Sequence, residues 1–348
     1  MSSQSSLYEL RSLWEPELRY LDTASYGLPP RPAWDALQQA LDDWRTGRGR
    51  WERWNEATDR ARELFGRLVG VPAGRVTVGS TVSGLVALVA ASVAEGTHVV
   101  VPESDFRSLL YPWLVHGDRL DVETVPLARL AEAVTPGVGV VAFSAVQSAT
   151  GELADLPAVE AAARDAGAFT VVDATHACGW LPLDAGRFDA VAAHGYKWLL
   201  SPRGTAFMAV SERLLERTRP LAAGWFAGDD PYGSYYGPPL RLAPDARRLD
   251  VSPAWFSWVG CEPALRVLLD AGVEAIHRHD LDLANRFRAG LGLPPGESAI
   301  VTVERAGAAE RLEAAAVRAA TRAGSLRASF HLYNTEADVD AALDALGA

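Results

Sequence analysis

Two stretches decide the fold: VVDATHACGW at residues 171–180 and AAHGYKWLLSPRG at residues 192–204. The first ends a Val-rich predicted strand with Asp173 and places His176 three residues later. The second places Lys197 in an apolar and aromatic run at the end of another predicted strand. The spacing between Asp173 and Lys197 leaves room for a short connection and one more strand. Both residues are therefore candidates for a single site.

The chemistry of these two residue types suits one kind of cofactor. A lysine with few charges around it loses its proton more easily than a surface lysine, and a neutral amine forms a Schiff base with a carbonyl. A carboxylate such as Asp173 can keep a heterocyclic nitrogen protonated, which pyridoxal phosphate needs in order to act as an electron sink. Each residue also has an ordinary structural explanation. A lone lysine after a strand is most often a surface residue, and an aspartate at a strand end most often caps a helix.

Further Val-rich segments lie on both sides of these stretches and predict the architecture. Strand-like runs at 75–79, 97–102, 137–144 and 205–210 alternate with helical segments, which is typical of an α/β fold with a mostly parallel sheet. Ligands in such sheets bind beyond the carboxyl ends of the strands. Residues 261–348 predict a long helix over about 262–290, a strand, and a last helix with Thr335 and Asp338 as a capping box.

The order of VVDATH, GYKW and SPRG, followed by RASFHLYNTE near the end, resembles the class V aminotransferase family of fold-type I pyridoxal phosphate enzymes. This family includes cysteine desulfurases, kynureninases and isopenicillin N epimerase-like proteins, and the resemblance covers nearly the whole chain. It implies an aspartate aminotransferase-like α/β fold with a mostly parallel seven-stranded sheet, in which the strand at 205–210 is antiparallel. It also implies a large cofactor-binding domain at 17–260 and a smaller α+β domain at 261–348, on which residues 1–16 can pack.

The resemblance further implies which residues hold pyridoxal 5′-phosphate. Those at the phosphate would be Ser80, Thr81 and the backbone of Val82, at a helix start whose unpaired N–H groups favour an anion. His194 and Tyr196 also occupy phosphate-binding positions of the family. Capped helix starts and packed aromatic residues are the ordinary alternative for each of these positions.

Other positions correspond to the ring of the cofactor and to the substrate. Phe106 would stack on the pyridine, and His176 would lie near the phenolic oxygen. Ser148 stands where the family commonly has an asparagine, so Gln147 is an alternative to it there. Arg327 would bind the substrate α-carboxylate through its planar guanidinium, or else form a surface or intersubunit salt bridge. Residues 24–26 could also approach the substrate.

Composition limits the partners. The 348 residues carry a net charge of −11 and no run of Lys or Arg, which argues against nucleic acid or an anionic membrane. Cys178 and Cys261 form neither a disulfide framework nor a zinc motif. The opening residues do not resemble a secretory signal, and the apolar run at 85–94 is too short to cross a bilayer. A cytoplasmic protein is expected.

The predicted activity is that of an enzyme processing an amino acid, in which Lys197 carries the Schiff base and moves the α-proton. The reaction is expected to be of aminotransferase or carbon–sulfur lyase type, the latter from a likeness to actinobacterial sulfoxide lyases of ergothioneine synthesis. An amino acid epimerase and a catalytically inactive cofactor-binding homologue are the alternatives. Cysteine desulfuration is disfavoured because residues 300–326 contain no cysteine. The Gly-, Pro- and aromatic-rich segment 221–260 predicts an interface, which the resemblance assigns to a homodimer with shared active sites.

Overall fold

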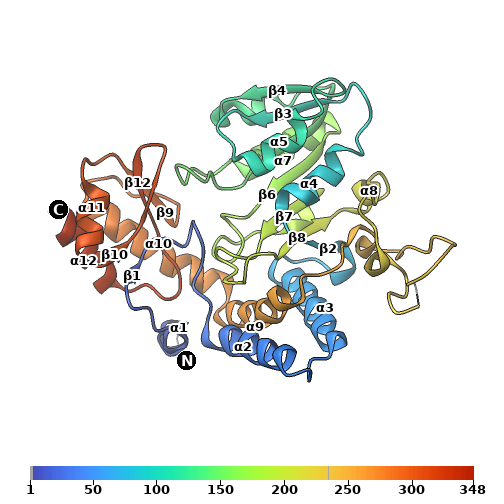
Figure 1. The fold of residues 1–348 in the computed structure, drawn as a ribbon. Coiled ribbons are helices and arrows are strands. Elements are labelled where there is room, and N and C mark those ends of the chain that lie inside the picture. Colours follow the sequence, from blue (N-terminus) through green and yellow to red (C-terminus); the bar gives the residue numbers. More distant parts are fainter. Residues whose placement is uncertain (1–2, 234) are drawn as a thin grey trace.

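A computed structural model describes residues 3–233 and 235–348, and a seven-stranded sheet forms its centre (Figure 1). The strand order is β2-β8-β7-β6-β5-β3-β4, and every neighbouring pair is parallel except the two that involve β8. The strands are β2 (Val76–Gly79), β3 (His98–Pro102), β4 (Asp121–Val125), β5 (Val138–Ser144), β6 (Phe169–Asp173), β7 (Ala190–His194) and β8 (Ala206–Val210). The predicted fold class and the antiparallel strand after the lysine are confirmed.

Helices cover both faces of this sheet, which explains the continuous apolar character of its strands. One face packs against α4 (Val82–Ala90) and α5 (Arg107–Leu114). The other packs against α3 (Trp51–Leu68), α7 (Leu156–Ala166) and α9 (Trp255–Ala271), with α2 (Arg31–Arg45) lying against α9. Short helices α6 (Leu130–Ala133) and α8 (Glu212–Leu215) complete this part of the chain. No helix in the described residues combines the length and apolarity needed to cross a membrane.

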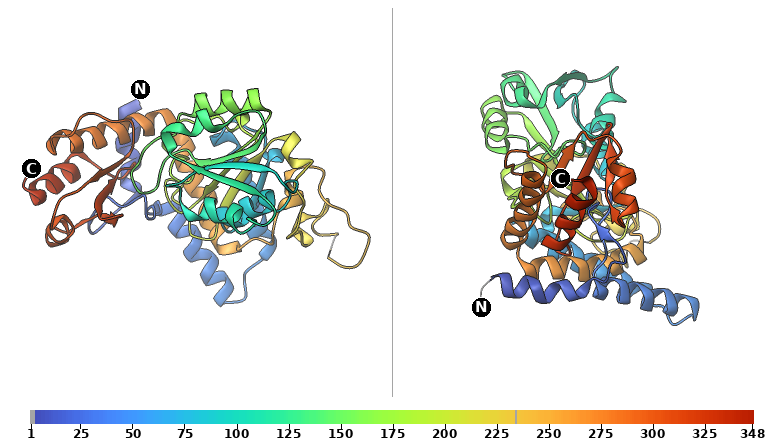
Figure 2. Two further views of the ribbon diagram at one scale, coloured as in Figure 1. Left: turned by 90° about the horizontal axis from the view of Figure 1, so that it is seen from above. Right: turned by 90° about the vertical axis from the view of Figure 1, so that its left-hand side faces the viewer.

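A smaller layer at the side of the main sheet contains the end of the chain (Figure 2). Its antiparallel sheet has the order β11-β12-β9 and consists of β9 (Ile300–Val303), β11 (Ala320–Arg322) and β12 (Ser325–Ser329). It packs with α10 (Val273–Gly290), α11 (Ala308–Ala314) and α12 (Glu336–Leu346). The start of the chain joins this layer, because β1 (Arg19–Tyr20) pairs in parallel with β10 (Val317–Arg318), and α1 (Ser3–Leu10) contacts α9 and α10.

One expected helix is divided in two. Gly272 has a φ of 78°, a left-handed conformation that glycine adopts without steric cost, and it separates α9 from α10 where one helix over 262–290 was predicted. The predicted domain boundary at 260/261 lies inside α9, which packs on α2 and α3. The domain limits therefore stay a prediction. The capping box of Thr335 and Asp338 at the start of α12 is confirmed.

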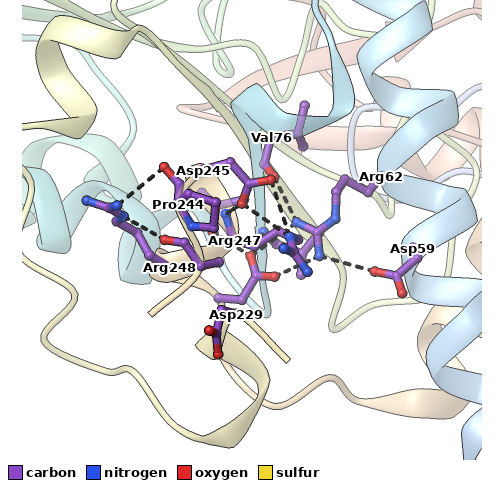
Figure 3. Close-up of polar contacts among 12 residues, drawn as sticks. Asp59, Arg62, Val76, Asp229, Pro244, Asp245, Arg247 and Arg248 are labelled. Carbon is purple, nitrogen blue, oxygen red and sulfur yellow. Dashed lines mark hydrogen bonds and ion pairs between the residues drawn. The ribbon is translucent and has the colours of Figure 1, made fainter. Parts of the chain in front are cut away.

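A buried ion pair fixes the edge of the main sheet from which the α4 turn departs. Asp250 is fully buried and accepts hydrogen bonds from Arg62 Nη2 at 2.7 Å, Thr77 Oγ1 at 2.9 Å and the Val78 N–H at 2.9 Å. The Arg62 guanidinium also donates to the Val76 carbonyl at 2.7 Å (Figure 3). This clamp ties α3, β2 and residue 250 together directly before residues 80–82.

Candidate active site

Lys197 lies in the turn after β7 and is the one lysine in the 348-residue sequence. Its side chain is buried, with Nζ 2.6 Å from His176 Nε2 and less than 6 Å from the ring centres of Phe106 and Tyr196. Burial, and then the positive charge of Arg327, lower the pKa of Lys197 to about 7. A large fraction of this amine is therefore neutral and nucleophilic near neutral pH.

Asp173 and His176 come from the end of β6, the strand next to β7. Asp173 Oδ1 accepts a hydrogen bond from the Thr175 N–H at 2.8 Å, and burial raises the pKa of this carboxyl to about 6. Burial, and then the charge of Lys197, hold the pKa of His176 well below its usual value. His176 is thus a neutral imidazole that can exchange a hydrogen bond with the lysine amine.

The segment after β1 closes one side of the lysine turn. The Gly27 N–H donates to the Tyr196 carbonyl at 2.8 Å. A Cβ at position 27 would lie 2.1 Å from the Lys197 carbonyl oxygen and 2.7 Å from Leu200 Cδ2. Only glycine permits this approach, so the backbone at Gly27 packs directly on the turn that holds the lysine.

The residues predicted to bind phosphate gather at the start of α4. Thr81 caps this helix, with Oγ1 accepting from the Gly84 N–H at 3.1 Å, and Ser80 and Thr81 border a pocket of about 200 Å³. The Val82 N–H donates to His194 Nε2 at 3.2 Å, which requires a neutral imidazole; burial lowers the pKa of His194 to about 4. His194 Nδ1 is buried and has no hydrogen-bond partner among the described residues.

Asp105 is a buried site residue with little signal in the sequence. Its carboxylate accepts from the Phe106 N–H at 2.7 Å, the Ser144 N–H at 2.7 Å, Ser144 Oγ at 2.5 Å and Gln147 Nε2 at 3.3 Å. It therefore fixes the turn that presents Phe106 to Lys197 and joins it to the end of β5. The available signal was its position, directly before Phe106 and after a buried strand.

Arg327 lies on β12 and reaches the site from the smaller layer. Its side chain is 1% exposed, and its guanidinium donates to the Ser148 carbonyl at 2.5 Å and to Ser25 Oγ at 3.1 Å. Ser148 is thus placed beside the predicted carboxylate-binding arginine. Arg322, which had no signal in the sequence, donates to the same Ser25 Oγ at 3.0 Å. Burial, and then the charge of Arg322, lower the pKa of Arg327 to about 10.

These groups fit the separate parts of pyridoxal phosphate. The buried amine of Lys197 suits the aldehyde, and the buried carboxylate of Asp173 suits the pyridine nitrogen. The Phe106 ring, held by Asp105, suits the face of the pyridine. The start of α4, with the hydroxyls of Ser80 and Thr81, suits the phosphate. The fit rests on the chemistry of the donors and on the unpartnered buried nitrogen of His194.

Comparison with known proteins agrees with this fit. The model of the family "Aminotransferase class-V" matches residues 19–310, and the chain belongs to that family. It is therefore a pyridoxal phosphate-dependent enzyme, of the group that contains transferases and lyases.

Individual relatives and structures show the range of the likeness. The chain is 32% identical to a kynureninase of Deinococcus radiodurans over 78% of this chain and 70% of that protein. It is 30% identical to an isopenicillin N epimerase of Streptomyces clavuligerus over 83% of each chain. Its fold matches the cystine C–S lyase C-DES, solved with cysteine persulfide, with a TM-score of 0.85 and 19% identity over 95% of this chain and 97% of that one.

Proposed function

We propose that Lys197 carries the cofactor and that the enzyme acts on an amino acid by aminotransferase or carbon–sulfur lyase chemistry. The observation that carries the proposal is the buried amine of Lys197, with its pKa lowered to about 7 and its Nζ 2.6 Å from the neutral His176 imidazole. When bound, pyridoxal phosphate supplies an electron sink that weakens the bonds at the substrate α-carbon. The protein decides which bond breaks.

Each residue of the site has a proposed task. Lys197, once its amine is free, removes the proton from the α-carbon, and His176 Nε2 can hold or return a proton at Nζ. The Asp173 carboxylate keeps the pyridine nitrogen protonated. Arg327 binds the α-carboxylate, and its Nε, buried and without a partner in the described structure, is a donor available for that task. Ser80, Thr81, Val82, His194 and Tyr196 are proposed to surround the phosphate, with Ser148 supporting Arg327.

The likeness to an isopenicillin N epimerase supports amino acid epimerisation as a second candidate. The fold shared with a cystine C–S lyase is compatible with the lyase proposal. An inactive homologue is less favoured, because Lys197, Asp173 and Arg327 are all present and buried.

We also propose a homodimer with shared active sites in the cytoplasm. Tyr26 and Trp34 are exposed beside a pocket of about 400 Å³ that Tyr196 and Arg203 also line. A second chain covering this pocket would remove large apolar groups from water close to the lysine turn.

The first test is reduction of the purified enzyme with borohydride after its visible absorbance has been recorded. A yellow protein whose reduced pyridoxyl group maps to Lys197 is expected, and Lys197→Ala should carry no such group. The single lysine makes the assignment unambiguous. A colourless protein that stays colourless with added pyridoxal phosphate would overturn the proposal.

Amino acids are then supplied to the yellow enzyme in deuterated water. Keto acid formation without release of ammonia or a sulfur species identifies an aminotransferase, because the amino group stays on the cofactor. Release of a sulfur species together with keto acid and ammonia identifies a carbon–sulfur lyase. An inverted amino acid with deuterium at the α-carbon identifies an epimerase. Turnover by Lys197→Ala equal to that of the unaltered enzyme would contradict the role given to the lysine.

A further inference from the structure

Arg322 and Arg327 occupy one face of a tight hairpin. Strands β11 and β12 are joined through Ala323 and Gly324, whose φ angles of 48° and 83° suit a two-residue turn. Arg322 pairs with Ser325, and Arg327 is two residues further along β12. Side chains two residues apart on a strand share a face, so the two arginines are diagonal neighbours.

The two guanidinium groups converge on one hydroxyl. Nη2 of Arg322 and Nη2 of Arg327 donate to Ser25 Oγ at 3.0 and 3.1 Å, so these two nitrogen atoms lie within about 6 Å of each other. Arg327 is buried, whereas Arg322 is exposed. One cation is therefore buried, and the other reaches solvent.

Protein carboxylates balance these charges only in part. Asp22 Oδ1 lies 3.9 Å from Arg327 Nη2, and burial raises the pKa of this carboxyl. The charge of Arg322 is also felt at the reacting amine, where it follows burial and Arg327 among the causes that lower the pKa of Lys197. A substrate with a single carboxylate neutralises one guanidinium and leaves the other without an anion.

We propose that Arg322 binds a second carboxylate, on the substrate side chain, and that the enzyme prefers amino acids with an acidic side chain. The inference rests on the proposed function, in which Arg327 binds the α-carboxylate. Apart from the Thr321 carbonyl at 2.9 Å and Ser25, the Arg322 guanidinium has no hydrogen-bond partner among the described residues. Its other N–H groups are available to a carboxylate oxygen.

The test compares binding of acidic amino acids with that of their amides. Holoenzyme is titrated with L-aspartate and L-glutamate, and with L-asparagine and L-glutamine as neutral probes of nearly the same shape. Dissociation constants come from calorimetry and from changes in the cofactor spectrum. Arg322→Gln is compared with Arg327→Gln and with Arg318→Gln, a matched control that removes an exposed arginine from the adjacent β10.

The unaltered enzyme is expected to bind the acids more tightly than the amides. Arg322→Gln should raise the dissociation constants of the acids by about tenfold to a hundredfold, the usual cost of a lost charged hydrogen bond. It should change those of the amides by less than about twofold. Arg327→Gln should weaken binding of both the acids and the amides, and Arg318→Gln should leave binding of both unchanged. Equal weakening of acids and amides by Arg322→Gln would mean that both arginines hold the α-carboxylate, and would overturn the proposal.

A preference of the unaltered enzyme for the amides, or equal binding of acids and amides, would overturn it too. Because calorimetry measures binding without relying on colour, loss of acid selectivity can be told apart from failure of the proposed function. The latter would show as absence of a reducible cofactor on Lys197. Arg322 is exposed, so its variant should keep the melting temperature of the unaltered enzyme.

Discussion

At the scale of the residue, the site depends on making one amine neutral. Lys197 is buried beside a neutral histidine, and the positive charges of Arg327 and Arg322 disfavour its protonated form. An ordinary lysine has a pKa of about 10.4 and would be almost fully protonated at neutral pH. Burial and the arginines thus prepare the amine for the cofactor before any ligand arrives.

This arrangement predicts the pH dependence of cofactor loading. In enzyme stripped of cofactor, only neutral Lys197 reacts, so the rate of colour formation should rise as the pH passes upward through about 7. Arg327→Gln removes a nearby positive charge, so the pKa of Lys197 and the midpoint should rise. Stopped-flow absorbance across a pH series measures this midpoint. Arg129→Gln, at an exposed arginine, is the control and should leave the midpoint unchanged. A common midpoint near 10 for all three proteins would contradict the explanation.

At the scale of the element, the clamp between Arg62 and Asp250 holds α3 against β2, from which residues 80–82 depart. A buried ion pair adds little over apolar groups, but losing one partner leaves the other charge buried and unpaired. Replacing only one member of the pair should therefore lower the free energy of unfolding substantially.

The expected cost of Arg62→Met is about 3–5 kcal/mol in the free energy of unfolding. Arg62→Met combined with Asp250→Leu should lose less than the sum of the two single changes, because no unpaired charge is left. Urea denaturation followed by circular dichroism measures these values. Asp59→Asn is the matched control: Asp59 lies 3.6 Å from Arg62 Nη2 but is exposed, so its change should cost less than about 1 kcal/mol (Figure 3). Additive losses in the double variant would refute the account.

At the scale of the whole molecule, the exposed aromatic side chains near the lysine turn predict a second subunit. Trp34→Glu places a charge in the proposed contact, so it should convert a dimer to a monomer and lower cofactor retention. Light scattering after size exclusion measures the mass. Tyr8→Glu, at another exposed aromatic residue, should leave the mass unchanged. A monomer for the unaltered enzyme would exclude the proposed shared site.

The site residues that could be predicted from the sequence are those that follow the ends of strands. Asp173 and Lys197 could be identified because each follows a run of buried, β-branched or small residues in a parallel sheet. Asp105 is recognised only through its partners on β5, and Arg322 only through a hairpin that brings it to Ser25, nearly three hundred residues earlier. The break at Gly272 depends on a positive φ, a conformation that glycine allows but does not require.

Because the chain has a single lysine, proteolysis at that residue can report when the segment that covers it moves away. In enzyme stripped of cofactor, a protease that cleaves only after lysine can cut the 348-residue sequence at one bond, between Lys197 and Trp198. That bond lies under Gly27 and next to a fully buried indole, so the protease cannot reach it while the segment after β1 stays in place. The rate at which two fragments, residues 1–197 and 198–348, appear would therefore measure how often that segment separates from the lysine turn.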